Sequence, residues 1–185
     1  MMKNWLLKIA FSITRWVGRQ HWPYIHKKMT AANCLAISKN LHPGDVLLSH
    51  NEGELSNVLI SGFWKHAAIA VDSEVIVEAI GSGVRKCHIV DFAMKKDFVS
   101  VWRPAFASKE QRAVAADYAK CQVGTPYDYE FQSGNKAFYC SELVHAAYDH
   151  AMGGKSPFEM RPRYGILTVI PNDIARAEKK FLRLI

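Results

Sequence analysis

The sequence predicts an α+β fold in which an antiparallel β-sheet packs against helices. Five short apolar segments of strand type lie between residues 46 and 103, and turn residues separate them. Two clear helical patterns follow the strands, one at 108–121 and one that runs from residue 140 to the paired glycines at 153 and 154. The chain has 185 residues, of which 49% are apolar, so it is long enough for one domain with its own core and is not expected to be disordered.

An N-terminal helical segment at 1–40 is predicted to precede a folded domain at 41–185. Residues 2–17 have the pattern of an amphipathic helix that lies at a membrane surface. The apolar positions near one stripe of this helix are Trp5, Ile9, Ile13, Trp16 and Val17. The same stripe is equally compatible with packing against the protein's own core. A second, weaker helical pattern covers residues 25–40.

The basic start of this segment resembles an export signal. Lys8 interrupts the apolar run, Arg15 ends it and no small-residue cleavage site follows, so export is the less favoured interpretation. The run is also too short and too charged to span a bilayer. The formal net charge is +7, and the first 28 residues contain basic side chains but no acidic one, so an anionic membrane surface is an expected partner of residues 1–28. Nucleic acid is not expected, because basic and aromatic residues are not interleaved in a surface motif.

The strands are predicted in an order with short connections. A turn at 41–45 leads into the first strand, and a polar loop at 51–61 follows it. The predicted strands are 46–48, 66–71, 74–80, 84–90 and 98–103. Their spacing is that of a meander, which predicts antiparallel pairing.

The helices have recognisable starts and stops. Ser108 with Gln111 three residues later forms a capping-box pattern, and Gly124 follows the end of that helix. A polar loop precedes the helix that begins at Cys140. The segment from 155 to 185 contains three prolines and then a short basic helix from Asn172 onward.

Cys140 is a candidate nucleophile because of its place at the start of a helix. The free backbone N–H groups and the positive end of the helix dipole favour a thiolate there and supply donors for an oxyanion. The alternative is a small buried apolar residue, which is the commonest role of an isolated free cysteine.

The cysteines also bear on compartment and cofactors. The four residues, Cys34, Cys87, Cys121 and Cys140, include no C-x-x-C pair and no Cys/His pattern at metal spacing, so neither disulfides nor a metal site is expected. A reducing compartment follows, which predicts a cytoplasmic protein, either free or peripheral at the membrane. No metal and no organic cofactor is expected, and the sequence leaves the oligomeric state open.

His66 is the predicted base and Glu78 the residue that orients it. Glu78 is the one charged residue inside the apolar run 75–80, where an unpaired carboxylate would be costly. A three-residue loop at 72–74 would place Ala68 opposite Glu78 and His66 diagonal to it, within hydrogen-bonding reach. The alternatives are a solvent-exposed histidine and an edge carboxylate in water. The histidines considered as weaker candidates for the base are His42, His50 and His88, and those expected at the surface are His145 and His150.

The ordered motifs of the chain resemble the YiiX-like branch of the NlpC/p60 superfamily, which consists of circularly permuted papain-like cysteine hydrolases related to the lecithin retinol acyltransferase-like proteins. The motifs that carry this resemblance are Gly44-Asp-Val-Leu47, His66-Ala-Ala-Ile-Ala-Val71, Val77-Glu-Ala79, Gly124-Thr-Pro-Tyr-Asp-Tyr129 and Tyr139-Cys-Ser-Glu-Leu-Val144. The resemblance implies a permuted papain-like fold, a nucleophile at Cys140, a base at His66 and a polar third member, which Glu78 matches. Tyr127 is predicted to line the substrate cleft or assist at the oxyanion, although a packing role is the alternative. Tyr139 and Ser141, on either side of the cysteine, are also predicted to bind substrate.

The predicted activity is hydrolysis of an amide bond through a Cys-His-Glu triad and a thioester. The substrate implied by the resemblance is a peptide of cell-wall type, and more generally a peptide or an acyl-containing molecule. One alternative is a thiol acyltransferase or lipid (thio)esterase at a membrane surface. Another is a membrane-associated binding protein that has the fold without the activity.

Overall fold

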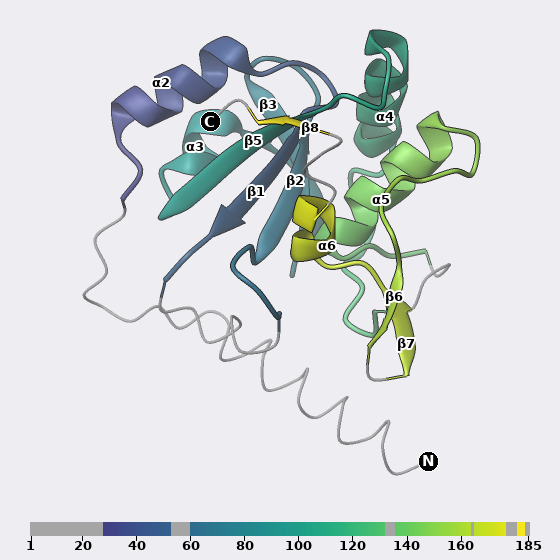
Figure 1. Ribbon diagram of the computed structural model, residues 1–185. Helices are drawn as coiled ribbons and strands as arrows, with labels where there is room; N and C mark the ends of the chain where they lie inside the picture. Colours follow the sequence, from purple (N-terminus) through teal and green to yellow (C-terminus); the bar gives the residue numbers. More distant parts are fainter. Residues whose placement is uncertain (1–27, 53–59, 132–135, 164, 177–180, 184–185) are drawn as a thin grey trace.

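The computed structural model describes residues 28–52, 60–131, 136–163, 165–176 and 181–183 (Figure 1). Its centre is an antiparallel sheet with the strand order β4-β3-β2-β1-β5-β8. The strands are β1 (Val46–His50), β2 (His66–Ala70), β3 (Val75–Ile80), β4 (Gly83–His88), β5 (Phe98–Pro104) and β8 (Phe181–Arg183). A separate hairpin is formed by β6 (Arg161–Arg163) and β7 (Ile166–Thr168). The predicted α+β class with an antiparallel sheet is confirmed.

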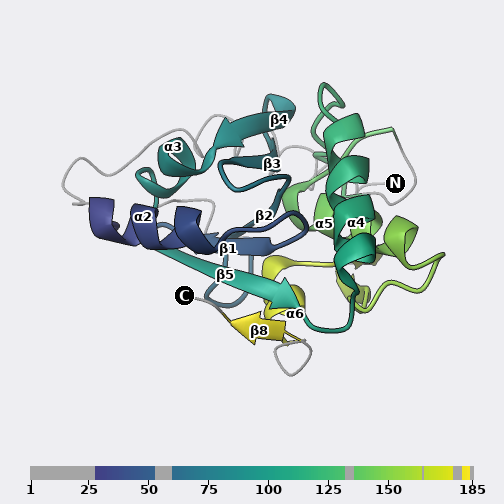
Figure 2. The same cartoon turned by 90° about the horizontal axis from the view of Figure 1, so that it is seen from above.

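Helices cover both faces of the sheet, with α2 and α3 on one side and α4 and α5 on the other (Figure 2). The described helices are α2 (Ala31–Asn40), α3 (Ile89–Ala93), α4 (Lys109–Cys121), α5 (Cys140–Ala151) and α6 (Pro171–Arg176). None of them has the length and apolar character needed to cross a bilayer. The amphipathic pattern predicted at 2–17 lies outside the described residues.

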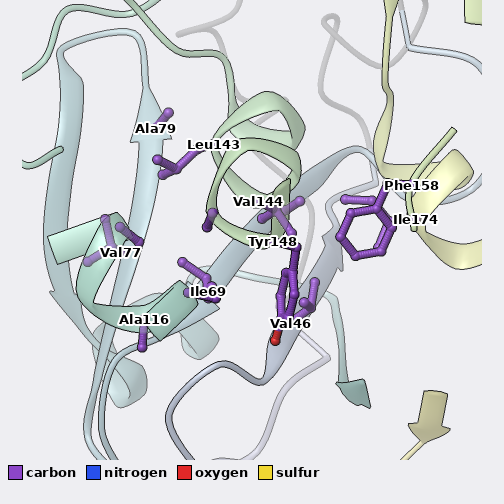
Figure 3. Packing of buried hydrophobic residues seen from close by; sticks show 14 of the residues in the cluster. Val46, Ile69, Val77, Ala79, Ala116, Leu143, Val144, Tyr148, Phe158 and Ile174 are labelled. Atoms are coloured by element: carbon purple, nitrogen blue, oxygen red, sulfur yellow. The ribbon is translucent and has the colours of Figure 1, made fainter. Parts of the chain in front are cut away.

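Each face of the sheet has its own apolar core because successive strand residues point to opposite sides. Val46, Ile69 and Val77 face α4 and α5, where they pack against residues such as Leu143 and Tyr148 (Figure 3). The opposite cluster lies between the sheet and the helices α2 and α3. Its main members are Ile37, Leu41, Leu47, Ala68, Ile76, Ile89, Phe92 and Val101.

Three sequence-based expectations about the sheet require correction. The fourth strand ends at His88 rather than at residue 90, because the His88 side chain accepts a hydrogen bond from the Val90 N–H (3.2 Å) and caps α3. The spacing of a simple meander is also misleading, since β5 pairs with β1 and not with β4. The strands β6, β7 and β8 were not predicted.

Candidate active site

Helix α5 places Cys140 at its first position. The preceding residue, Tyr139, has an extended backbone (φ −92°, ψ 169°), and the helix starts immediately after it. Leu143, Val144 and Ala147 then anchor α5 on the sheet, where they are fully buried. The sulfur of Cys140 accepts hydrogen bonds from two backbone N–H groups, those of Ala67 and Ser141. An otherwise buried thiolate is stabilised by donors of this kind.

The imidazole of His66 lies between the sulfur and a carboxylate. Its Nε2 is 2.8 Å from Glu78 Oε2, and its side chain is also hydrogen-bonded to Cys140. Because Nε2 is used by Glu78, Nδ1 is the ring nitrogen left to face the sulfur. The structure therefore brings Cys140, His66 and Glu78 into one hydrogen-bonded series.

The position of Glu78 follows from the β2–β3 hairpin. Ala68 pairs with Glu78, and Val71 donates its N–H to the Val75 carbonyl (2.9 Å), which leaves the three-residue loop 72–74 expected from the sequence. The hairpin is fixed by Asp72, whose Oδ1 accepts hydrogen bonds from the N–H groups of residues 74 and 75. The predicted register is confirmed, and it leaves His66 diagonal to Glu78 on the same face.

Glu78 has a second partner that sequence reasoning missed. Arg85, directly opposite on β4, donates to Glu78 Oε1 from Nε (2.9 Å) and from Nη2 (2.7 Å). Burial raises the pKa of Glu78, but the hydrogen bonds and charges of His66 and Arg85 outweigh it and lower the pKa to about 2. Glu78 is therefore ionised at neutral pH despite being only 2% exposed.

The pKa shifts of the sulfur and the imidazole favour an ion pair between them. Burial lowers the pKa of His66, but its hydrogen bonds with Cys140 and Glu78 outweigh this effect and raise the pKa to about 9. Burial raises the pKa of Cys140, yet the hydrogen bond and positive charge of His66, with the two backbone donors, lower it below the ordinary value. A thiolate and an imidazolium are the forms that these shifts favour at neutral pH.

The three side chains meet at one end of the sheet, although they come from different sides of it. The side chains of His66 and Glu78 lie on the same face of the sheet as Ala68, which is the face covered by α3. The His66 ring centroid is 6.0 Å from that of Phe92. Cys140 begins α5, which packs on the other side. Contact is made because His66 is the first residue of β2, so that its ring lies at the strand end that α5 approaches.

A cleft of about 270 Å³ opens over this point. The residues that line it are Ser49, Asn51, Ile60, Lys65, His66, Ala79, Ile80, Gly81, Lys96, Tyr127 and Cys140. Tyr127 is thus at the cleft, and burial raises its pKa well above the ordinary value, so that its hydroxyl is a neutral donor. Its ring packs edge-on against Tyr129, whose hydroxyl donates to the Gly81 carbonyl (2.6 Å).

Tyr139 and Ser141 are not among the described residues that line the cleft, and their side chains bind the protein's own backbone instead. Both are almost fully buried, at 2% and 1% exposed. The Tyr139 hydroxyl accepts a hydrogen bond from the Val169 N–H (3.1 Å), and Ser141 Oγ donates to the Val169 carbonyl (2.8 Å). These contacts hold the start of α5 against the segment that follows β7, and substrate binding by the two side chains stays a prediction from sequence.

Asn172 of α6 binds the backbone of the segment 61–64, which leads into His66. Its Nδ2 donates to the carbonyls of Ser61 (2.7 Å) and Trp64 (2.6 Å), and its Oδ1 accepts from the Trp64 N–H (3.1 Å). Gly62 lies against this amide with φ at +90°, where an added Cβ would be 2.4 Å from Asn172 Cγ. The sequence contains no local signal for this contact, because the residues involved are more than 100 positions apart.

The other histidines have different surroundings. His88 caps α3, the His50 ring stacks on Phe63 (4.6 Å between centroids), and the His150 ring lies 4.9 Å from that of Tyr118. Within the part of the chain that the structure describes, no group of three or more His, Cys, Asp or Glu residues is arranged to hold a metal ion.

Known proteins share both the sequence pattern and the fold. A sequence model of the permuted papain-like amidase enzymes of the YaeF/YiiX, C92 family matches residues 40–178. Among solved structures, that of the metalloprotein yiiX from Escherichia coli O157:H7 is similar, with a TM-score of 0.64 and 21% sequence identity over 77% of this chain and 95% of that one. At this identity the likeness shows the fold alone. Among curated proteins, no significant match is found.

Proposed function

The chain belongs to the family of permuted papain-like amidases, and from this premise we propose that it is a cysteine amidase or peptidase that acts through Cys140, His66 and Glu78. The observation that carries the proposal is the hydrogen-bonded pair of Cys140 and His66 at the entrance of α5, with ionised Glu78 behind the imidazole. A thiolate formed in advance needs no separate deprotonation step before it attacks a carbonyl carbon.

The first half of the reaction forms a thioester. The Cys140 thiolate adds to the amide carbonyl, and the oxyanion is stabilised by backbone N–H groups at the start of α5, with the neutral hydroxyl of Tyr127 as a further donor at the cleft. The imidazolium of His66 gives its proton to the leaving amine as the C–N bond breaks. Glu78 keeps the ring oriented through Nε2 during this transfer.

The second half of the reaction hydrolyses the thioester. Neutral His66 takes a proton from water, whose oxygen attacks the acyl carbon, and the released thiolate and imidazolium restore the starting pair. The pair is intact only while His66 remains protonated in the free enzyme, so kcat/KM should fall as the pH rises through about 9. Peptides of cell-wall type are the first substrates to test, because they are what the family resemblance implies.

Alkylation with iodoacetamide, followed by mass spectrometry of each cysteine peptide, tests the proposal without a known substrate. Cys140 should react faster than Cys34, Cys87 and Cys121, with a pH midpoint below about 8.5. His66→Ala should slow the reaction at Cys140 about tenfold or more at pH 7, because the thiolate loses its cation. Cys121→Ala, on the exposed end of α4, is the matched control. Equal reactivity at all four cysteines would instead favour a binding protein without catalytic activity.

Acyl transfer or lipid (thio)ester cleavage at a membrane is a second proposal, supported by the basic character of residues 1–28. The same thioester would form on Cys140, and its acyl group would pass to another acceptor in a transferase or to water in an esterase. Flotation with anionic vesicles, with and without residues 1–28, tests the membrane contact, and equal flotation of the two forms would remove its main support.

A further inference from the structure

The base lies at an end of the central sheet where the pairing between strands is incomplete. On the β1 side, His66 is the outermost residue of β2 in register and faces Ser49. On the β3 side, the register begins only at Ala68. Strand ends open more easily than strand centres, so the position of the imidazole depends on what holds the segment that leads into β2.

Asn172 holds that segment from a distant part of the chain. Its side-chain amide donates to the carbonyls of Ser61 and Trp64 and accepts from the N–H of Trp64, which lies two residues before His66. Gly62 lies against the same amide, with its φ at +90°. One side chain thus fixes the path of the backbone at both ends of the segment 61–64.

The residues just before this side chain hold the nucleophile. The Val169 N–H donates to the Tyr139 hydroxyl (3.1 Å), and the Val169 carbonyl accepts from Ser141 Oγ (2.8 Å). Tyr139 and Ser141 are the two neighbours of Cys140 in the chain. Residues 169–172, here called the bridge, therefore contact both the start of α5 and the segment that precedes the base.

The bridge is itself firmly attached to the fold. Asp173 is 5% exposed, and its Oδ2 accepts from the Ile170 N–H (2.9 Å) while its Oδ1 accepts from Arg163 Nη2 (2.7 Å). Val169 and Ile174, on either side of these contacts, are fully buried in the core between the sheet and α5, where Figure 3 shows Ile174. The bridge cannot shift without breaking these contacts, so it fixes the two catalytic elements relative to each other.

We propose that the bridge sets the position of His66 relative to Cys140, with Asn172 as a positioning residue for the base. This inference rests on the proposed function and adds a residue that does not touch the triad. The Ala67 N–H, which donates to the sulfur, directly follows His66 and moves with the same strand end. Loosening the bridge should therefore weaken the imidazole contact and the Ala67 contact together, and both stabilise the thiolate.

Asn172→Ala removes the contacts with the segment 61–64 and leaves every group that touches the sulfur in place. The rate of Cys140 alkylation by iodoacetamide at pH 7 should fall about threefold to tenfold, and the pH midpoint of the rate should rise. Urea unfolding reports the stability of each variant. Arg103→Gln, which breaks an ion pair with Asp45 before the other end of β1, is the control, because it should lower the stability without moving the midpoint.

Gly62→Ala disturbs the same contact from the opposite side. The added Cβ would lie 2.4 Å from Asn172 Cγ, so the midpoint should rise here too. Gly154→Ala is the matched control for backbone strain, because φ is +83° there and no described atom lies within 4 Å of the added Cβ. In the Asn172→Ala background the clash is absent, so Gly62→Ala should slow the alkylation much less than it does alone.

Ser141→Ala cuts the bridge at its other end, while the backbone N–H of residue 141 still donates to the sulfur. Because the bridge links the two elements in series, the double variant Asn172→Ala/Ser141→Ala should react little more slowly than the slower of the two single variants. If the two rate reductions multiply instead, the contacts act independently and the bridge is overturned.

The outcomes separate this inference from the proposed function. A wild-type Cys140 that reacts faster than Cys121 supports the proposed function. If Asn172→Ala and Gly62→Ala then lower the stability but keep the wild-type pH midpoint, the bridge alone is overturned. A wild-type Cys140 that reacts no faster than Cys121 would overturn the proposed function, and the bridge with it.

Discussion

Glu78 and Glu142 are both buried, at 2% and 6% exposed, yet their carboxyl pKa values are shifted in opposite directions. Glu78, on the side of the sheet covered by α3, has Arg85 and His66 as partners, and its pKa is lowered to about 2. Glu142, in the first turn of α5, accepts one long hydrogen bond from the Tyr139 N–H (3.4 Å). Burial raises its pKa to about 7, and the charge of Asp128 adds to this effect.

The difference shows that partners, and not burial alone, decide the charge of a carboxyl group. A helix N-terminus by itself favours a carboxylate by about 0.3 to 1 kcal/mol, which is too little to offset the removal of the Glu142 charge from water. For Glu78, the hydrogen bonds and positive charges of His66 and Arg85 are sufficient to offset the effect of burial on its pKa. The carboxylate that orients the base is therefore the one supported by a charge network, and four substitutions test this contrast.

Glu78→Gln should have the largest effect. The amide cannot stabilise the imidazolium, so kcat/KM should fall about a hundredfold or more. The free energy of unfolding at pH 7 should fall by about 2 kcal/mol. This value is smaller than the full pKa shift would give, because Arg85 is 45% exposed and solvent screens its charge. Because the pKa of Glu78 is lowered in the folded state, its stabilisation is present above pH 4.5 and lost as the pH falls toward 2. Urea unfolding at pH 7 and pH 2.5 should therefore show the full loss at the first pH and roughly a quarter of it at the second.

Arg85→Gln should reduce kcat/KM by about threefold to tenfold, because Glu78 keeps His66 but loses its guanidinium partner. The apparent acidic pKa of the activity profile should rise, since Glu78 is easier to protonate without the positive charge of Arg85. Lys86→Gln, at the neighbouring exposed position of β4, is the matched control. A pH profile that is identical in the two variants would show that Arg85 has no electrostatic role in the site.

Glu142→Gln should stabilise the protein at alkaline pH. Since the folded pKa of Glu142 is raised above its ordinary value of 4.5, its contribution to stability is full below pH 4.5 and is lost as the pH rises through 7. At pH 8.5 the substitution should increase the unfolding free energy by about 1 to 2 kcal/mol, with little change at pH 4.5. A stability difference that is independent of pH, measured by urea unfolding, would mean that Glu142 is not protonated in the folded state.

Asp128→Asn should have the smallest effect. The amide Oδ1 still accepts the hydrogen bond that Glu130 N–H now donates to Asp128 Oδ1 (2.8 Å), while the negative charge near Glu142 is removed. The pKa of Glu142 should fall by about one unit or less, because burial is the larger cause of its shift. Titration of the Glu142 carboxyl carbon by NMR measures this change, and a fall all the way to 4.5 would reverse the order of the two causes.

Much of this arrangement follows from local sequence. The helical pattern after Cys140 predicts where α5 starts, and the turn at 72–74 predicts the register that puts His66 beside Glu78. The partner Arg85 was missed because the residue opposite Glu78 depends on the length of the turn after β3. If Gly83 is counted in the turn, Glu78 faces Lys86, whereas the observed turn contains only Gly81 and Ser82 and places Arg85 opposite Glu78.

Other features depend on contacts that no local pattern encodes. The position of β5 beside β1 follows from the path of the chain through α3, which the connection length alone does not specify. The lysines of the cleft come from segments 31 residues apart in the sequence, Lys65 and Lys96, and neither has a motif around it. That these two lysines line one cleft follows only from the folded structure.

The amide of Asn172 uses both of its ends, as a donor to two carbonyls and as an acceptor from one N–H. Aspartate lacks the donor, and glutamine places the same group one methylene further from the backbone. In an alignment of relatives, this column should therefore tolerate almost no exchange, unless the stretch before the base histidine changes with it. A coordinated change at these two distant stretches would mark a lineage that supports its base in a different way.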